Sequence, residues 1–227
     1  KELGANAIEF LDDKSLQTAR HYRNIPYDIN DINTNDTGIL VEYQNDDKNE
    51  ILSLLKKTKG FLKKNDSIKS TLMVTDDEKR EAIWKIRKGL YPTIGALRKS
   101  GESVITEDIA IDYTNISLAV DELKNIFTKR NFNDSVIFGH AKDGNLHFVT
   151  SVDFNSEKGI NNYGLLMNDL AEMTLQKFNG SLKAEHGTGR NMAPFVESEW
   201  GGEIYKLMWN LKESVDPNNI LNPDVLL

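Results

Sequence analysis

Apolar and polar residues follow two different periods along this chain, and the changes between them predict its helices and strands. Alternation with a period of two, or a short apolar run, predicts strands at residues 38–44, 70–74, 104–111, 135–140 and 145–153. Recurrence at three and four residues predicts helices at 14–23, 46–58, 75–99, 116–127 and 158–178, with one or two more within 192–214. The Asn- and Asp-rich stretch 27–37 and the proline-punctuated tail 216–223 are predicted to be coil.

Local signals indicate where several of these elements begin and end. Thr75-Asp-Asp-Glu78 has the spacing of a capping box. Pro92 is expected to kink or end the helix that this box begins. Asn179-Gly180 suits a helix C-cap, and a short extended segment is expected to follow at 181–185.

The order of the predicted elements indicates an α+β fold. From Val104 onward it is β-α-β-β-α-β, the ferredoxin-like pattern, which gives an antiparallel sheet with helices packed mainly on one face. The β-α units that precede it are expected to extend the same sheet. We divide the chain into an N-terminal leader or loop segment, residues 1–37, and one domain, residues 38–227.

Composition and charge narrow the class of protein. The 227 residues carry a net charge of −7, which argues against nucleic acid or an anionic membrane surface as the main partner. Without cysteine, the chain has no disulfide, thiolate zinc site or iron–sulfur cluster of its own, which suits a reducing, cytoplasmic location. No apolar run reaches the roughly 18 residues that suggest a membrane span. The chain starts at Lys1 without a signal or transit pattern, and we expect it to be a piece of a longer protein.

Two histidines flank the predicted hairpin turn. Asp143-Gly144 favours a two-residue type I′ turn, which sets His140 directly opposite His147. Opposed residues share one face of a sheet with Cβ atoms about 4.5–5.5 Å apart, so the two imidazoles could chelate one cation. They could equally be sheet histidines that are exposed or satisfied by neighbouring hydrogen bonds. The residues alone leave both interpretations open.

A second segment, Glu185-His186-Gly187-Thr188-Gly189, supplies further candidates. Either Glu185 or His186 could provide a third ligand, and a cation with an open position could activate a substrate oxygen. A histidine left free could act as a base, because its ordinary pKa of about 6.5 suits proton abstraction near neutrality. On their own, Arg87 suggests a solvated helix residue and Thr106-Glu107-Asp108 a turn at the end of a strand.

Three segments taken together resemble one family. GHAKDGNLHF, ITEDIAI and SLKAEHGTGR, followed by a terminal DPNNILNP, are similar to the C-terminal substrate or cap region of FAD-linked oxidases of the D-lactate, glycolate and D-2-hydroxyglutarate dehydrogenase group. The stretch EHGTGRNMAPFVESEWG most resembles the large bacterial FAD/FMN-containing dehydrogenases, which carry a flavin domain before this region and an iron–sulfur segment after it. The resemblance covers roughly Gly38 to the C-terminus.

The resemblance implies a mechanism and a role for each candidate residue. A D-2-hydroxy acid would be oxidised to the 2-oxo acid, with hydride transfer to flavin N5. His140, His147 and Glu185 would bind a divalent metal, expected to be zinc, that holds the substrate hydroxyl. His186 would take the hydroxyl proton. Arg87 would clamp the substrate carboxylate, for which a bidentate guanidinium is suited.

The resemblance also implies a partner that this chain lacks. FAD would be bound mainly by a flavin domain of the same protein, with Asn222 of the terminal Asn-Pro near it. Residues 1–37 would then be a remnant of the junction with that domain, and the chain alone would be inactive. The substrate would be a small 2-hydroxy acid; no nucleic acid and no transmembrane segment are implied, and the whole protein could associate peripherally with a respiratory chain.

Departures from the family pattern leave the substrate open. Thr106 stands where the D-2-hydroxyglutarate enzymes have a substrate-binding Lys, and Val149 where they have an Asn. Two other functions also stay open. One is a metal-dependent hydrolase that uses the same histidines and glutamate, and the other is a non-catalytic ferredoxin-like interaction module with structural histidines.

Overall fold

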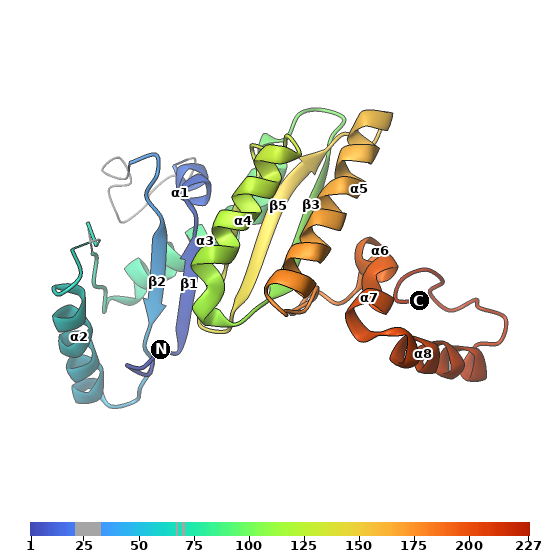
Figure 1. Ribbon diagram of the computed structural model, residues 1–227. Coiled ribbons are helices and arrows are strands. Elements are labelled where there is room, and N and C mark those ends of the chain that lie inside the picture. The colour runs from blue at the N-terminus through green and yellow to red at the C-terminus, as the bar shows by residue number, and fades with distance from the viewer. Residues whose placement is uncertain (21–32, 67, 70) are drawn as a thin grey trace.

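A five-stranded antiparallel sheet organises the part of the chain that the computed structural model describes, residues 1–20, 33–66, 68–69 and 71–227 (Figure 1). The strands are β1 (Ala7–Leu11), β2 (Gly38–Glu42), β3 (Ser103–Ala110), β4 (Val136–His140) and β5 (Asn145–Val152), in the order β2-β1-β4-β5-β3. The longer helices are α1 (Asp13–Ala19), α2 (Lys48–Leu62), α3 (Asp77–Leu97), α4 (Ile116–Lys129), α5 (Glu157–Glu172) and α8 (Gly202–Val215). Shorter ones are α6 (Gly189–Met192) and α7 (Val196–Trp200), and a π-helical stretch, Met173–Lys177, continues α5. Among the described residues no helix is both long and apolar enough to cross a membrane.

The second half of the sheet has the predicted ferredoxin-like arrangement. In the unit β3-α4-β4-β5-α5, β5 lies between β3 and β4, and every neighbouring pair is antiparallel. After α5, Ser181 forms an isolated bridge with Ala110 at the outer edge of β3, so the last predicted strand is reduced to this bridge. β1 and β2 continue the sheet beyond β4. The α+β fold class is confirmed.

The strands bury a different apolar core on each face. Ile137 and Phe148 pack beneath α4 and α5, which cover one face of the sheet in Figure 1. Successive strand residues point to opposite faces, so the next residues along, Phe138 and Val149, pack with Leu90 of α3 on the other face. The second face therefore carries a helix as well, although the larger core lies under α4 and α5.

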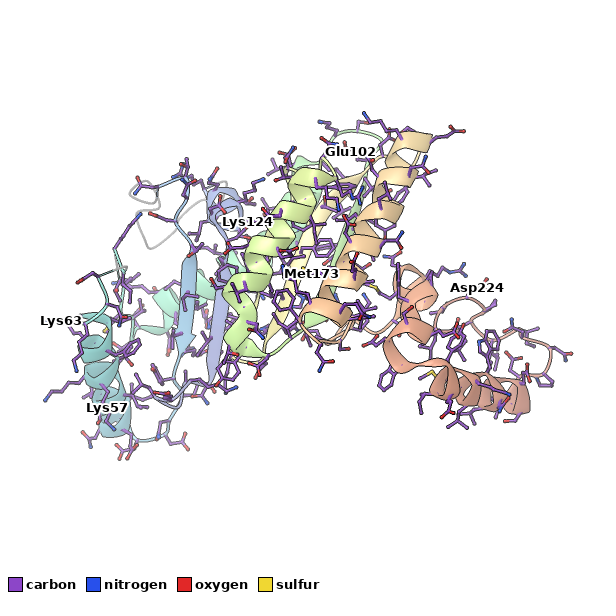
Figure 2. All side chains as sticks on the ribbon, viewed as in Figure 1. Lys57, Lys63, Glu102, Lys124, Met173 and Asp224 are labelled. Carbon is purple, nitrogen blue, oxygen red and sulfur yellow. The ribbon has the colours of Figure 1, made fainter. Side chains whose placement is uncertain are left out.

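Burial differs sharply between the middle of the molecule and its two ends. Met173 is buried at the end of α5, and Figure 2 shows it among the side chains at the sheet. Lys57 and Lys63 project outward from α2 and its C-cap in the same view. Neither α2 nor α8 has a buried residue. The folded core is thus the sheet with α1, α3, α4 and α5.

The largest missed element is β1, which lies between β2 and β4 although no strand was predicted within residues 1–37. Its run AIEFL is only five residues long, too short for a periodic signal, and its burial depends on two distant strands. Residues 7–11 are therefore a strand of the same sheet as residues 38–42. The division at residue 37 as a domain boundary stays a prediction.

Two local predictions are wrong. Residues 71–74 form no strand and are half-buried or exposed; Ser70 lies outside the described residues. The cap of α3 is Asp76 rather than Thr75, because the Asp76 carboxylate accepts a hydrogen bond from the backbone N–H of Lys79. Pro92 lies inside α3, which continues to Leu97, close to the predicted helix end at residue 99.

Most other boundaries agree with prediction to within a few residues. The predicted helix 14–23 is confirmed up to Ala19, and residues 21–32, which include the start of the predicted loop 27–37, lie outside the described part. The C-cap of the π-helical stretch is Phe178, one residue before the predicted cap, and Asn179, with φ of 48°, follows it. Residues 192–214 were predicted to hold one or two helices, and they hold α7 and α8 after a 3₁₀ turn at Ala193–Phe195.

Candidate metal and substrate site

The β4–β5 hairpin brings His140 and His147 to one face of the sheet in a register that differs from the predicted one. His140 pairs with Asn145, not with His147, because a four-residue loop replaces the two-residue turn. In this loop Gly144 has φ of 75°, and its carbonyl accepts a hydrogen bond from the backbone N–H of Ile111. The register differs from prediction by two residues, so both histidines keep the expected face. They are diagonal neighbours, with ring centroids 5.2 Å apart.

Two buried carboxylates flank the histidines on the same face. Glu9 of β1 is the cross-strand partner of His140, and Asp108 of β3 is the partner of His147. Both side chains are buried. Glu9 is not among the candidates from the sequence, and Asp108, expected in a turn at the end of a strand, lies within β3. A carboxylate inside a strand was the available signal, because Asp and Glu are seldom fully buried unless they are paired.

Glu9 holds His140 and Arg87 at once. Its Oε1 lies 2.7 Å from His140 Nδ1, and its Oε2 lies 2.9 Å from Arg87 Nε. Burial alone would raise the pKa of Glu9, but the hydrogen bond to His140 and the charge of Arg87 outweigh it and keep that pKa below its usual value. The same hydrogen bond raises the pKa of His140. With Nδ1 on the carboxylate, Nε2 of His140 faces the site, which is the usual arrangement of a metal-binding histidine.

His140, His147 and Glu185 offer three ligand atoms that all lie within 4.8 Å of one another. Glu185 Oε1 is 3.3 Å from His140 Nε2 and 3.2 Å from His147 Nε2. Burial lowers the pKa of His147 to about 4, so its imidazole is neutral at pH 7, as a metal ligand must be. The three residues predicted as ligands are therefore brought together. Asp108, His147 and His186 form a second group that meets the same distance criterion.

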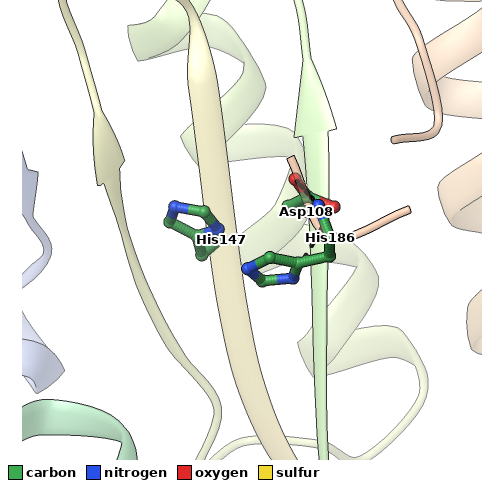
Figure 3. A group of neighbouring side chains, drawn as sticks. All are labelled: Asp108, His147 and His186. Atoms are coloured by element: carbon green, nitrogen blue, oxygen red, sulfur yellow. Dashed lines mark hydrogen bonds and ion pairs between the residues drawn. The ribbon is translucent and has the colours of Figure 1, made fainter. Parts of the chain in front are cut away.

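His186 lies against this cluster on the loop that follows Ser181 (Figure 3). Its ring stacks on that of His147 at a centroid distance of 4.9 Å. His186 Nδ1 is 3.7 Å from Asp108 Oδ1, and its Nε2 is 3.9 Å from Glu185 Oε1. The His186 side chain is 35% exposed, whereas that of His147 is 4% exposed. His186 is thus both close to the ligand group and open to solvent.

Arg87 and Asn222 lie in different surroundings. The Arg87 guanidinium lies 4.6 Å from the centre of the Phe138 ring, and both Glu9 and Glu185 act on it electrostatically. Arg87 is therefore part of the cluster rather than a solvated helix residue. Asn222 is exposed in the coil after α8, with φ of 44°. No hydrogen bond or ion pair within the described residues joins Asn222 to the histidines.

One family model matches almost the entire chain. Residues 1–226 match the model of FAD linked oxidases, C-terminal domain. This match begins well before Gly38 and includes β1, so it is longer than the resemblance found in the sequence.

Curated relatives give a consistent picture. Glycolate oxidase subunit GlcD of Bacillus subtilis is 26% identical over 95% of this chain and 44% of its own length. D-lactate dehydrogenase (cytochrome), mitochondrial, of Arabidopsis thaliana is 28% identical over 69% of this chain and 27% of its own length. D-2-hydroxyglutarate dehydrogenase, mitochondrial, of Arabidopsis thaliana is 27% identical over 96% of this chain and 37% of its own length. The chain thus spans less than half the length of each of these relatives.

A solved structure supports the fold. The 4-ethylphenol oxidase of Gulosibacter chungangensis superposes with a TM-score of 0.55 at 12% sequence identity, over 96% of this chain and 46% of that one. At this identity the likeness concerns the fold alone.

Proposed function

The chain belongs to the family of FAD linked oxidases, C-terminal domain, and from this membership we propose that it is the substrate- and metal-binding portion of an FAD-dependent D-2-hydroxy acid dehydrogenase or oxidase. The observation that carries the proposal is the convergence of His140, His147, Glu185 and His186 next to Arg87 on one face of the sheet. Relatives are named for glycolate, D-lactate and D-2-hydroxyglutarate, which share a hydroxyl group next to a carboxylate. The cluster offers a cation site, a base and a guanidinium for that pair of groups.

His140, His147 and Glu185 would hold a divalent metal ion, and zinc is the ion we expect. Two imidazole nitrogens and one carboxylate oxygen form a common catalytic zinc set. The residues fit because both Nε2 atoms face the same Glu185 oxygen and His147 is neutral. A bound ion would supply Lewis acidity that lowers the pKa of the substrate hydroxyl.

The remaining residues would bind the substrate and move its proton. Arg87 would bind the substrate carboxylate, since its guanidinium is held in place by Glu9 and the Phe138 ring. His186 would take the hydroxyl proton at Nε2, the nitrogen that lies near Glu185. FAD, held mainly by a flavin domain of the same protein, would supply N5 as the acceptor of the α-hydrogen, and Asn222 would lie near it.

The substrate side chain would lie near two neighbouring residues. Thr106 and Val149, the two departures from the D-2-hydroxyglutarate pattern, are cross-strand partners on β3 and β5. They lie on the same face as Asp108 and His147, because Thr106 is two residues before Asp108 in β3 and Val149 is two residues after His147 in β5. Because neither is charged, we propose a substrate without a second carboxylate at this position.

Removing the base tests the proposal directly in the flavin-loaded protein. His186→Ala should lower turnover by about 10²–10⁴-fold, the usual contribution of a general base, while flavin and metal contents stay unchanged. Normal turnover in this variant would show that His186 is not the base.

Metal analysis of purified variants tests the ligands. Glu185→Gln, His140→Ala and His147→Ala should each lose bound zinc, whereas Glu203→Gln, an exposed glutamate on α8, should retain it. Unchanged zinc in all three ligand variants would favour the interaction module with structural histidines. Metal-dependent ester or amide cleavage by this chain alone would favour the hydrolase instead.

The wider setting follows from the resemblance and is part of the same proposal. We place the protein in the cytoplasm, with a peripheral link to a respiratory chain, although some relatives carry mitochondrial names. An iron–sulfur segment elsewhere in the protein is proposed from the stretch EHGTGRNMAPFVESEWG. Sequencing of the complete gene and fractionation of the native host test both statements.

A further inference from the structure

Two consecutive buried carboxylates, Glu107 and Asp108, lie in β3 at the edge of the sheet. They point to opposite faces because they are neighbours in a strand. Burying a carboxylate costs several kcal/mol unless it is paired and hydrogen-bonded. The contacts of these two side chains therefore indicate why an edge strand retains them.

Asp108 binds the backbone of the loop that carries the proposed ligand and base. Its Oδ2 accepts hydrogen bonds from three consecutive N–H groups, those of Ala184 at 3.1 Å, Glu185 at 2.6 Å and His186 at 3.3 Å. A single carboxylate oxygen thus sets the path of residues 184–186.

The second oxygen of Asp108 is directed at the His186 ring. Oδ1 lies 3.7 Å from His186 Nδ1 and 3.9 Å from Lys183 Nζ. It is buried and accepts no hydrogen bond within the described structure. An unsatisfied buried carboxylate oxygen is costly, so a small approach of the His186 N–H toward it would be favourable.

Glu107 holds the same loop from the opposite face of β3. Its carboxylate forms an ion pair with Lys183, and its Oε1 accepts a hydrogen bond of 2.6 Å from Asn191 Nδ2. The loop is thus anchored near both ends by Glu107 and in the middle by Asp108. Of these two carboxylates, Asp108 is the one that faces the His186 ring.

We propose that Asp108 is a positioning residue that orients His186, and this inference rests on the proposed function. In the proposed substrate-bound state, Asp108 Oδ1 accepts the Nδ1–H of His186, which fixes the tautomer in which Nε2 carries the lone pair that receives the substrate proton. The distance of 3.7 Å shortens when substrate closes the site, since hydrogen bonds of catalytic groups are often long before substrate binds. Asp108 itself touches neither the substrate nor the flavin.

Asp108→Asn tests this role in the flavin- and metal-loaded protein. The amide oxygen can still accept the three backbone hydrogen bonds, but the NH₂ group then faces His186 Nδ1 and favours the opposite tautomer. We expect kcat to fall by about 10²–10⁴-fold, with KM changed less than about threefold and metal content unchanged. In the double variant with His186→Ala, kcat should be no lower than in His186→Ala alone, because the two residues act as a unit.

Two comparison variants separate orientation from general destabilisation. Asp169→Asn weakens the remote ion pair with Arg130 and should leave kcat unchanged at a temperature where the protein is folded. Glu107→Gln loosens the loop without changing what faces His186, so it should reduce kcat far less than Asp108→Asn. Equal losses for Glu107→Gln and Asp108→Asn would overturn the proposal, since anchoring of the loop would then explain both.

The failure of this inference can be told apart from the failure of the proposed function. If His186→Ala keeps normal turnover, the proposed base is wrong; if His186→Ala is inactive while Asp108→Asn is not, only the role of Asp108 is wrong. Should Asp108→Asn not fold, a long-range ¹H–¹⁵N spectrum of the ¹⁵N-histidine-labelled unmutated protein decides. A protonated Nδ1 and a bare Nε2 on His186 support the proposal, and the reverse tautomer overturns it.

Discussion

Replacement of Glu9 by Gln should weaken both the fold and the metal site, and the size of the first effect follows from burial. The Glu9 side chain is 4% exposed and that of its partner Arg87 is 12% exposed. Removing one member of a buried ion pair costs about 3–5 kcal/mol, because the other charge is left unpaired in a medium of low polarity. Gln keeps an acceptor for one of the two hydrogen bonds, so we expect a loss near the lower limit, about 3 kcal/mol. That is a large part of the roughly 5–15 kcal/mol that stabilises a typical domain.

The matched control is Glu122→Gln, which breaks an ion pair with Lys177 on the surface. These side chains are 32% and 54% exposed, and such pairs contribute about 0–1 kcal/mol. Urea unfolding followed by tryptophan fluorescence measures the free energy of unfolding of each variant. A cost below about 1 kcal/mol for Glu9→Gln, or one equal to that of Glu122→Gln, would refute the idea that burial makes the Glu9–Arg87 pair important.

A second variant and a second readout make the test sharper. Glu9→Leu combined with Arg87→Leu should cost less than Glu9→Leu alone, because no buried charge is then left without a partner. Zinc affinity should fall about 10–100-fold in Glu9→Gln, since carboxylates that orient ligand histidines typically contribute that much. Unchanged affinity would mean that His140 needs no help from Glu9 to bind metal.

Three further predictions concern pH, packing and the hairpin loop. In the metal-free chain the pKa of His147 is about 4 when folded and about 6.5 when unfolded, so the unfolded state binds more protons between these values. The free energy of unfolding therefore falls by at most about 3 kcal/mol through His147 as pH falls from 6.5 to 4. Urea unfolding at each pH should show a smaller fall in stability for His147→Phe. An equal fall in the variant and the unmutated chain would exclude His147 as the cause. Leu123→Ala, in the core, should lower the free energy of unfolding by about 2–5 kcal/mol. Leu118, on the same helix, is 61% exposed, so Leu118→Ala should lower it by under about 0.5 kcal/mol. Similar melting temperatures for the two variants would contradict the orientation of α4. Gly144→Ala should lower the free energy of unfolding by well over the roughly 1–2 kcal/mol of a left-handed alanine, because its Cβ would lie 1.8 Å from a backbone oxygen. The control Gly4→Ala has a similar φ and open space around its Cβ, so it should cost only that amount. Equal losses of stability in the two variants would refute the clash.

Local signals were enough for much of the fold and for the residues of the candidate site. α4 has apolar residues at helical spacing over fourteen residues, and its buried residues follow that spacing: Ala119, Val120, Leu123, Ile126 and Phe127. The period of two in β4 and β5 placed His140 and His147 on one face, and that remained true in the observed register. The family resemblance, not periodicity, assigned Glu185 as a ligand and His186 as a base.

The register of the hairpin and the partners of the buried carboxylates needed the tertiary structure. A two-residue slip leaves every side chain on its original face, so the apolar pattern cannot distinguish a two-residue turn from a four-residue loop. Contacts between the hairpin and the rest of the fold select the four-residue loop. One of these contacts is the hydrogen bond from the backbone N–H of Ile111 to the carbonyl of Gly144. The loop is therefore defined by the residue that follows β3 as well as by its own residues.

Glu9 and Asp108 show the same limit of local patterns. Glu9 meets His140 across a separation of 131 residues, and Asp108 meets the backbone of Glu185 across 77. Either carboxylate can be buried only because those partners form hydrogen bonds with it. The strand order β2-β1-β4-β5-β3 determines which groups lie close enough to do so. The sequence alone could therefore identify the chemical groups of the site, but only the assembled sheet decided which carboxylate orients which histidine.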